Sequence, residues 1–348
     1  MLGWLSMVPP SMHPFLSVVE RIRPDLDLVE RAMYEQLGSP SEVVHALGRH
    51  VLDAGGKRIR PALLLLAADL CGYAGPRRIQ VAAAVELLHT ATLLHDDVVD
   101  LSDLRRGRPS ANAIWGNRRA VLGGDFFYAR ASSMIVEDGD LDILWIFADT
   151  IRRMAEGELL QLERSFDATI TEQHYFAVIE RKSAVLLSAA CEAGSILGGV
   201  TRGERRRLRE FGHELGLAFQ LRDDALDYEA GEDVLGKLPR TDLREGKVTL
   251  PLLLALKRCT PAEHDAVAEV LKMAAHRAET NPAREADGAE LDLAPAIEVV
   301  DRYRGVADTV KRAELHRARA AESIAPFSDG TVKQHLLAAA DYAVGRDR

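Results

Sequence analysis

Cysteine is scarce in this sequence. Its 348 residues contain three cysteines, Cys71, Cys191 and Cys259, and these lie far apart. An odd number of isolated thiols argues against a disulfide framework and against the clustered ligands of a structural zinc site. We therefore interpret all three as ordinary buried thiols.

Long hydrophobic runs are missing as well. The apolar run PALLLLAADLCGYAG is interrupted by Asp69, whereas a membrane-spanning helix needs about 20 apolar residues in succession. The opening MLGWLSMVPPSMHPFLSVV has neither the basic start of a signal peptide nor the arginine content of a transit peptide. We expect a cytoplasmic protein without a stable membrane anchor.

An excess of positive charge is also lacking. Lys and Arg total 44 against 53 Asp and Glu, which gives a net charge of −9. This balance offers no general attraction to nucleic acid, so we expect no nucleic-acid partner and infer that a bound anion is met by a local basic pocket. Because 47% of the residues are hydrophobic and 28% are charged, the chain can bury a sizeable core.

Glycine and proline are sparse between long segments rich in Ala and Leu, and no stretch alternates apolar and polar residues as a strand does. The period of three to four residues predicts an all-α fold. Several segments are apolar almost all round, which is typical of helices buried on several sides. We expect one large helical bundle over residues 15–348 after a tail of residues 1–14. The predicted helices are 18–37, 41–53, 60–71, 78–100, 118–136, 141–166, 171–197, 203–228, 248–257, 261–275, 295–323 and 329–344.

Aspartates recur in one pattern at the ends of two apolar helices. The first copy lies in LLHDDVVD and the second in AFQLRDDALD. Residues four apart share a helix face, so Asp96 lies over Asp100 and Asp223 over Asp227, where like charges destabilise an isolated helix. The helix dipole also disfavours anions at this end. Two such copies indicate hard oxygen ligands for magnesium, which completes its shell with phosphate oxygens, whereas a single copy is usually a solvated acidic face.

Basic residues supply the complementary charge. GGKRIRP places Lys57, Arg58 and Arg60 after two glycines at the start of a helix, which favours anion binding. Other cations follow the aspartate motifs, and Lys182 stands within an otherwise apolar helix. His89 lies seven residues before Asp96, on nearly the same helix face, which favours a substrate-binding role over a core histidine.

These blocks together resemble the successive signatures of the trans-isoprenyl diphosphate synthases, most closely the long-chain polyprenyl synthases. The matching blocks are GGKRIRP, ELLHTATLLHDDVVDLSDLRRGRPS, GNRRAVLGGDF, EGELLQL, AFQLRDDALDY and GKLPRTDLREGKVTLPLL, and the closing YAVGRDR is also similar. The resemblance implies an isoprenoid-synthase type of helical bundle with a central active-site cavity. It also implies head-to-tail transfer of a prenyl group to isopentenyl diphosphate from an allylic diphosphate.

The resemblance also implies roles for individual residues. Metal ligands would be Asp96, Asp100 and Asp223, supported by Asp97, Asp224 and Asp227. They would hold a cluster of about three Mg²⁺ ions, with Mn²⁺ as an alternative metal. The allylic diphosphate would be held by Arg105, Lys182 and Lys237, and isopentenyl diphosphate by Lys57, Arg60, His89 and Arg106. Lys247 would be a supporting cation, and Ser183 and Gln220 would be the polar groups beside the reacting carbons.

Product length is expected to depend on the residues before the first aspartate motif. Ala91 and Thr92 put small side chains where short-chain members of the family have a bulky aromatic that stops elongation. The resemblance therefore implies a deep tunnel and an all-trans product of about seven to ten isoprene units. A geranylgeranyl product is the alternative.

Two alternatives belong to other classes. A terpene cyclase also ionises an allylic diphosphate, but DDALD and GGKRIRP both argue against it. A non-catalytic subunit of a heteromeric synthase would typically have lost aspartates or cations, which are all present here. The loop GKLPRTD departs from the family pattern at Leu238, Pro239 and Arg240. The family further implies a homodimer.

Overall fold

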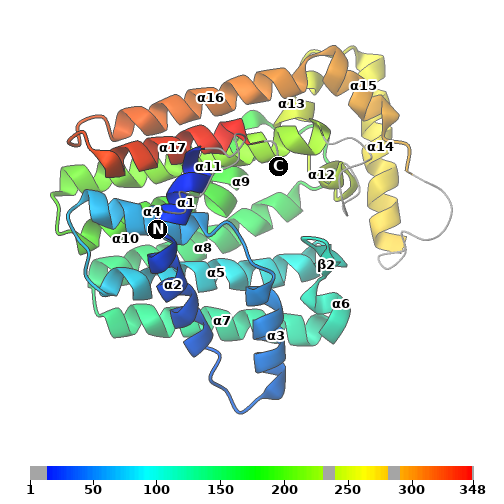
Figure 1. Cartoon of the computed structure of the whole chain (residues 1–348). Helices are drawn as coiled ribbons and strands as arrows, with labels where there is room; N and C mark the ends of the chain where they lie inside the picture. The colour runs from blue at the N-terminus through cyan, green and yellow to red at the C-terminus, as the bar shows by residue number, and fades with distance from the viewer. Residues whose placement is uncertain (1–13, 230–239, 281–290, 347–348) are drawn as a thin grey trace, which may run out of the picture.

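The computed structural model describes residues 14–229, 240–280 and 291–346. The predicted all-α fold is confirmed (Figure 1). Pro14, assigned to the tail on sequence, is the first residue of the first helix. The helical segments are α1 Pro14–Arg21, α2 Arg23–Glu35, α3 Glu42–Asp53, α4 Ile59–Leu70, α5 Arg77–Val99, α6 Ala111–Trp115, α7 Asn117–Asp138, α8 Leu141–Glu163, α9 Glu172–Ile179, the π-helical η1 Glu180–Ala184, α10 Val185–Leu197, α11 Arg202–Glu229, α12 Thr241–Arg244, α13 Leu250–Leu256, α14 Pro261–Thr280, α15 Ala294–Arg302, α16 Gly305–Ser323 and α17 Thr331–Gly345.

The helices stack in layers across the molecule. From one side to the other, α7 packs on α5, α5 on α4, α4 on α10, α10 on α11, and α11 on α16 and α17 (Figure 1). The central helices α4 and α10 are buried along most of their lengths. Helices with so little polar face need neighbours on several sides, as their sequences predict.

Two predicted helices are each divided in the structure. The segment 18–37 breaks at Ile22, because Pro24 begins a new helix more readily than it continues an old one. The segment 295–323 breaks at Arg304, which has a left-handed backbone with φ of 56°. The next residue, Gly305, lies so close to the backbone of Pro251 that a Cβ there would be 2.1 Å from the Pro251 carbonyl oxygen.

The expectation that the chain has no strand is wrong for four residues. Strands β1 (Leu104–Arg105) and β2 (Arg108–Pro109) pair antiparallel, with Leu104 opposite Pro109. The turn residues Arg106 and Gly107 both have positive φ, which suits the twist of a two-residue hairpin. The hairpin directly follows the first aspartate motif and carries both of its arginines.

The three cysteines are free thiols, but only Cys191 is fully buried, while Cys71 and Cys259 are half-buried. The interpretation of all three as buried thiols was therefore too simple. Among the described segments, no helix combines the length and apolarity needed to cross a membrane.

Candidate active site

The first aspartate motif lies where α5 ends. Its carboxylates face the negative end of the helix dipole, so their charge needs compensation. The Arg105 Nε lies 2.6 Å from Asp97 Oδ1, and the Lys247 Nζ lies 3.0 Å from Asp100 Oδ2. The chain thus places one cation from the hairpin and one from the loop before α13 on this helix end.

Among the described residues, Asp96 forms no such ion pair, and its surroundings differ from those of Asp97 and Asp100. Its burial raises the pKa of its carboxyl group to about 6, partly opposed by the nearby positive charge of Lys182. Lys182 itself lies in η1, with its Nζ 2.7 Å from Glu158 Oε1 on α8. Lys182, which the sequence places in an otherwise apolar helix, therefore lies close enough to Asp96 for the two charges to interact.

The second aspartate motif lies near the end of α11 and is also engaged by protein groups. Asp223 Oδ1 pairs with the Arg346 Nη2 at 2.5 Å, and this arginine stacks 3.5 Å over the Phe219 ring. Asp227 accepts backbone N–H groups at the start of α12, from Thr241 at 3.0 Å and from Asp242 at 3.3 Å.

A buried hydrogen-bond chain joins η1, α11 and α9. Ser183 Oγ donates to Gln220 Oε1 at 2.6 Å, and Gln220 Nε2 donates to Asp224 Oδ1 at 2.8 Å. The hydroxyl of Tyr175 donates to the other Asp224 oxygen at 2.5 Å. Burial, with the neighbouring Asp242 carboxylate, raises the pKa of Asp224 to about 8.

These groups surround a cavity of about 660 Å³ that opens to solvent. Its polar lining includes Lys182, Ser183, Gln220, Asp224 and Lys247, and its apolar lining comes largely from α9. The pocket thus brings together residues from η1, α11 and the loop before α13, which are far apart in the sequence.

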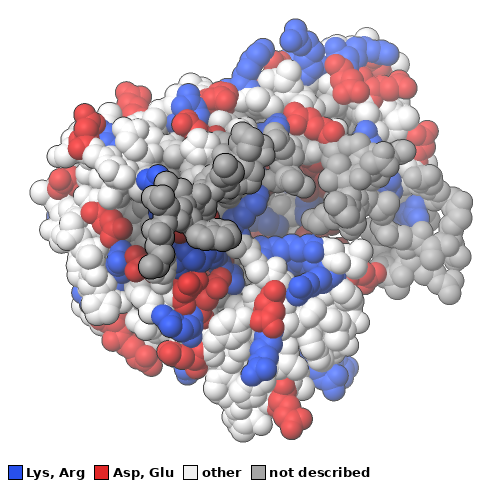
Figure 2. Space-filling view, viewed as in Figure 1, with Lys and Arg blue, Asp and Glu red and all other residues white. Residues whose placement is uncertain are grey.

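A second group of cations gathers where the turn before α4 meets α5 and the hairpin. Burial, together with the positive charges of Arg60, Arg106, Arg105 and Arg58, lowers the pKa of His89 well below its usual value. The imidazole is therefore neutral near pH 7. Figure 2 shows Lys and Arg side chains gathered around a hollow in the middle of this face.

The predicted cations do not all lie in the same surroundings. Lys57 is exposed, with its Nζ 5.3 Å from the centre of the Tyr342 ring. Arg60 is half-buried, and the Arg106 guanidinium donates to the Gly55 carbonyl oxygen. Arg58 is turned inward into ion pairs with Glu30 and Glu86.

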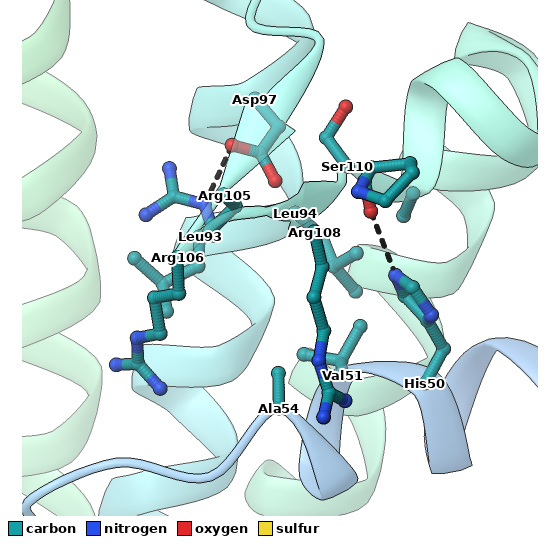
Figure 3. Close-up of a pocket in the computed structure, with 12 residues that line it drawn as sticks. His50, Val51, Ala54, Leu93, Leu94, Asp97, Arg105, Arg106, Arg108 and Ser110 are labelled. Atoms are coloured by element: carbon teal, nitrogen blue, oxygen red, sulfur yellow. Dashed lines mark hydrogen bonds and ion pairs between the residues drawn. The ribbon is translucent and has the colours of Figure 1, made fainter. Parts of the chain in front are cut away.

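A smaller cavity of about 410 Å³ lies beside the hairpin (Figure 3). Arg105, Arg106 and Arg108 line it together with α3 and the end of α5. His50 Nε2 lies 2.9 Å from the Pro109 carbonyl oxygen, which ties the hairpin to α3. The contact fixes the segment that presents the arginines.

The donor set of the two aspartate motifs suits a divalent metal. Over residues 14–229, 240–280 and 291–346, no three His, Cys, Asp or Glu side chains are grouped to hold a metal ion. Protein cations occupy three of the carboxylates instead. Carboxylate oxygens are the ligands that magnesium prefers, and a metal would take the place of these cations while sharing its shell with diphosphate oxygens.

Three predicted site residues need separate mention. Lys237 lies outside the described residues. Ala91 is 2% exposed on α5, and Thr92 Oγ1 donates to the His89 carbonyl oxygen at 2.8 Å. Neither Ala91 nor Thr92 lines the two cavities above. The predicted tunnel below the first motif stays a prediction.

Several residues of the site were missed on sequence. Tyr175 and Glu158 sit on helices whose periodicity does not distinguish them from other part-buried polar residues. Arg346 was noticed only as part of the similar C-terminal block, and its contact with Asp223 depends on how α17 packs on α11. The π-helical turn η1 also escaped, although such turns are frequent at functional sites.

Comparison with known proteins places this geometry in a family. Residues 41–286 match the model of the family described as polyprenyl synthetase. The chain is 41% identical over 324 residues to an octaprenyl diphosphate synthase of Escherichia coli, covering 93% of this chain and 96% of the relative. It is 37% identical over 321 residues to an all-trans-nonaprenyl-diphosphate synthase of Rhodobacter capsulatus, covering 92% and 94%.

Solved structures agree with these sequence matches. A polyprenyl synthase of Caulobacter crescentus, complexed with calcium and isoprenyl diphosphate, superposes with a TM-score of 0.87 at 40% identity, covering 98% of this chain and all of that one. A decaprenyl diphosphate synthase of Rhodobacter capsulatus gives 0.87 at 36% identity, covering 96% and 100%. The chain belongs to the polyprenyl synthetase family of divalent-metal-dependent prenyltransferases.

Proposed function

We propose that this chain condenses isopentenyl diphosphate head-to-tail with an allylic diphosphate to give an all-trans polyprenyl diphosphate of about seven to ten isoprene units. The observation that carries the proposal is the ion pair between Lys247 and Asp100. It brings the loop that follows the second aspartate motif onto the first motif, beside the cavity lined by Lys182 and Gln220. The octaprenyl, nonaprenyl and decaprenyl relatives support the long product.

The two diphosphates are assigned to the two cation groups. Lys182, Lys247 and Arg105 stand around the first motif and would hold the allylic diphosphate, together with Lys237. The group around His89 would hold isopentenyl diphosphate through Lys57, Arg60 and Arg106. A neutral His89 donates or accepts a hydrogen bond there without adding to the repulsion among the arginines.

Magnesium ions bound by Asp96, Asp100 and Asp223 would supply positive charge to the leaving diphosphate. In the first step the allylic carbon–oxygen bond breaks, and the oxygen keeps the electron pair. Lys182 and Arg105 stabilise the charge that develops on the departing group. The cation left behind is faced by the dipoles of Ser183 and Gln220, which lower its energy without forming a bond to it.

The double bond of isopentenyl diphosphate then attacks the allylic carbon to form the new carbon–carbon bond. The resulting tertiary cation loses a proton from the carbon next to it, which restores a double bond. The departed diphosphate is the candidate acceptor of this proton. Each cycle thus lengthens the chain by one isoprene unit, and the tail would descend past Ala91 and Thr92.

Incubation of the purified chain with farnesyl diphosphate, isopentenyl diphosphate and Mg²⁺ tests the proposal. After removal of the diphosphate, chromatography should show products of about seven to ten isoprene units. Products that stop at geranylgeranyl length would contradict the long-chain assignment. A chain that is inactive alone but active after a second subunit is added would be part of a heteromeric synthase.

We also propose a homodimer formed through α8. Most of its exposed residues recur alternately four and three positions apart, as in the seam of two packed helices. The largest are Leu141, Trp145, Leu159 and Leu162, each more than half exposed. Such a row of large apolar side chains is unusual on a monomer and fits a self-complementary interface. We call it the α8 seam; its members are Leu141, Trp145, Ala148, Arg152, Ala155, Leu159 and Leu162.

A further inference from the structure

The acid Glu86 is buried in α5 beside the cations assigned to isopentenyl diphosphate. Its exposed fraction is 5%, and burial of a carboxylate is costly unless the charge is paired. Glu86 Oε1 accepts from the Arg58 Nη1 at 3.1 Å, and the Arg58 side chain is only 6% exposed. A buried ion pair of this kind adds little net stability, because desolvation of both charges offsets their attraction.

Arg58 uses its whole guanidinium to hold a turn. Its Nε lies 2.8 Å from Glu30 Oε1 on α2, and its Nη2 donates to the Leu52 carbonyl oxygen at 3.3 Å. The backbone at Arg58 is left-handed, with φ of 49°, a conformation that a non-glycine residue keeps only when its surroundings hold it. This turn places Lys57 immediately before Arg58 and Arg60 shortly after it.

Among the described residues, two buried side-chain atoms of Glu86 and Arg60 lack hydrogen-bond partners. Within the described part of the chain, Glu86 Oε2 and Arg60 Nε are both buried without a hydrogen bond. One is an acceptor and the other a donor. Burial lowers the pKa of Arg60 and of Arg106, and the Glu86 carboxylate is the first opposing charge on each. Glu86 therefore offsets the mutual repulsion of these arginines.

We propose that Glu86 is a positioning residue for isopentenyl diphosphate. Through Arg58 it fixes the turn that carries Lys57 and Arg60, and through its second oxygen it orients Arg60 when the substrate arrives. Binding of the substrate then costs less ordering entropy, because the turn that carries the cations is already fixed. This inference rests on the proposed function, which assigns isopentenyl diphosphate to these cations.

Steady-state kinetics of Glu86→Gln tests the inference. The amide keeps the shape and one acceptor but removes the charge. We expect the KM for isopentenyl diphosphate to rise about tenfold, with kcat and the KM for farnesyl diphosphate within about twofold of wild type. Calorimetric titration with isopentenyl diphosphate should show the same loss of affinity. Electrostatics alone predicts the opposite, because removing a negative charge near a diphosphate site strengthens anion binding; an unchanged or lower KM would overturn the inference.

Glu192→Gln is the matched control. Glu192 is a buried acid on α10 that pairs with the Arg205 Nε at 2.7 Å, away from the cation groups. We expect it to lower the melting temperature while leaving both KM values unchanged. If Glu192→Gln raises the KM for isopentenyl diphosphate equally, the effect is one of general stability and the inference fails.

Arg58→Lys is the second variant, for the case in which Glu86→Gln does not fold. A lysine keeps the charge but cannot reach Glu30, Glu86 and Leu52 together, so the same selective rise in KM is expected. A normal KM in this variant would reject the positioning role. A wild-type chain that incorporates no isopentenyl diphosphate would reject the proposed function, whereas an active wild type with unaffected variants rejects only this inference.

Discussion

At the scale of single residues, the aspartates of the two motifs differ in the protein groups that face them. Asp97, Asp100 and Asp223 pair with side-chain cations, and Asp227 accepts backbone N–H groups. Asp96 instead has a raised pKa. The aspartates of one motif therefore have different surroundings although their sequence spacing suggests equivalent roles.

The raised pKa of Asp96 predicts a pH-dependent metal affinity. Because its pKa is about 6 without metal, a proton must leave before Mg²⁺ binds below that pH. We expect the apparent Mg²⁺ affinity to rise up to about tenfold per pH unit below pH 6 and to level off above it. Isothermal titration of the protein with Mg²⁺ between pH 5 and pH 8 measures this, at an ionic strength kept constant.

The raised pKa of Asp96 also determines how this group changes the stability of the fold with pH. The pKa of Asp96 is higher in the folded state than its ordinary value of 3.8, so its contribution to stability is present below pH 3.8 and is lost as the pH rises through 6. Asp96→Asn should flatten the pH dependence of both the Mg²⁺ affinity and the free energy of unfolding. A wild-type Mg²⁺ affinity that does not change across this range would disprove the assignment of Asp96.

Ala91→Phe tests the predicted tunnel wall. Ala91 is buried on α5, so a phenylalanine blocks the proposed path and should shorten the product to about geranylgeranyl length, at an overpacking cost of about 1–3 kcal/mol. Chromatographic sizing of the products measures the change. Ala91→Ser, which adds one oxygen, is the control and should keep the length. An unshortened product from an active Ala91→Phe variant would show that the tail follows another path.

At the scale of elements, the π-helical turn η1 sets the position of Lys182 and Ser183. Neighbouring glycines allow it to lie close to α8 and α11. A Cβ on Gly157 of α8 would lie 2.9 Å from the Lys182 backbone nitrogen, and one on Gly216 of α11 would lie 2.5 Å from the Ala184 Cα. Both neighbours are backbone atoms, which cannot move without displacing the turn.

Gly157→Ala should therefore damage the site as well as the fold. We expect a loss of about 1–3 kcal/mol in the free energy of unfolding and a higher KM for the allylic diphosphate, because Lys182 moves away from Glu158. Urea denaturation and steady-state kinetics measure the two effects. Gly203→Ala is the control, since a Cβ there meets only Thr201 Oγ1 at 3.8 Å. Equal behaviour of the two variants would mean that η1 tolerates the shift.

Sequence reasoning could single out those candidate site residues whose signal is local. The aspartate spacing, the glycine-rich turn with Lys57 and Arg60, and Lys182 in an apolar helix are all visible within one helix or turn. Contacts between distant segments were not visible, as with Tyr175 on Asp224, Arg346 on Asp223 and Glu86 beneath Arg58. The break at Arg304 was missed because helical periodicity continues across it, and the break at Ile22 was missed although Pro24 is a local signal for a new helix.

At the scale of the whole molecule, the α8 seam predicts association. Trp145→Asp places a charge among the apolar side chains of the seam, where it would be buried without a partner, so the dimer should dissociate. Light scattering after size exclusion measures the mass. Leu315→Asp on α16 is the control, because Leu315 is 47% exposed outside the seam. A monomeric wild type, or a Trp145→Asp variant that remains dimeric, would refute the interface.

The cations that sit on the aspartates have a consequence for how ligands cooperate. If Asp100 and Asp223 hold the metal as proposed, Lys247 and Arg346 would have to leave these carboxylates, and an arriving diphosphate would give each released cation a new anion. Metal and diphosphate therefore strengthen each other's binding by the same factor, as any linked pair of equilibria requires. Without substrate the enzyme should bind magnesium weakly, because Lys247 and Arg346 then stay paired with Asp100 and Asp223.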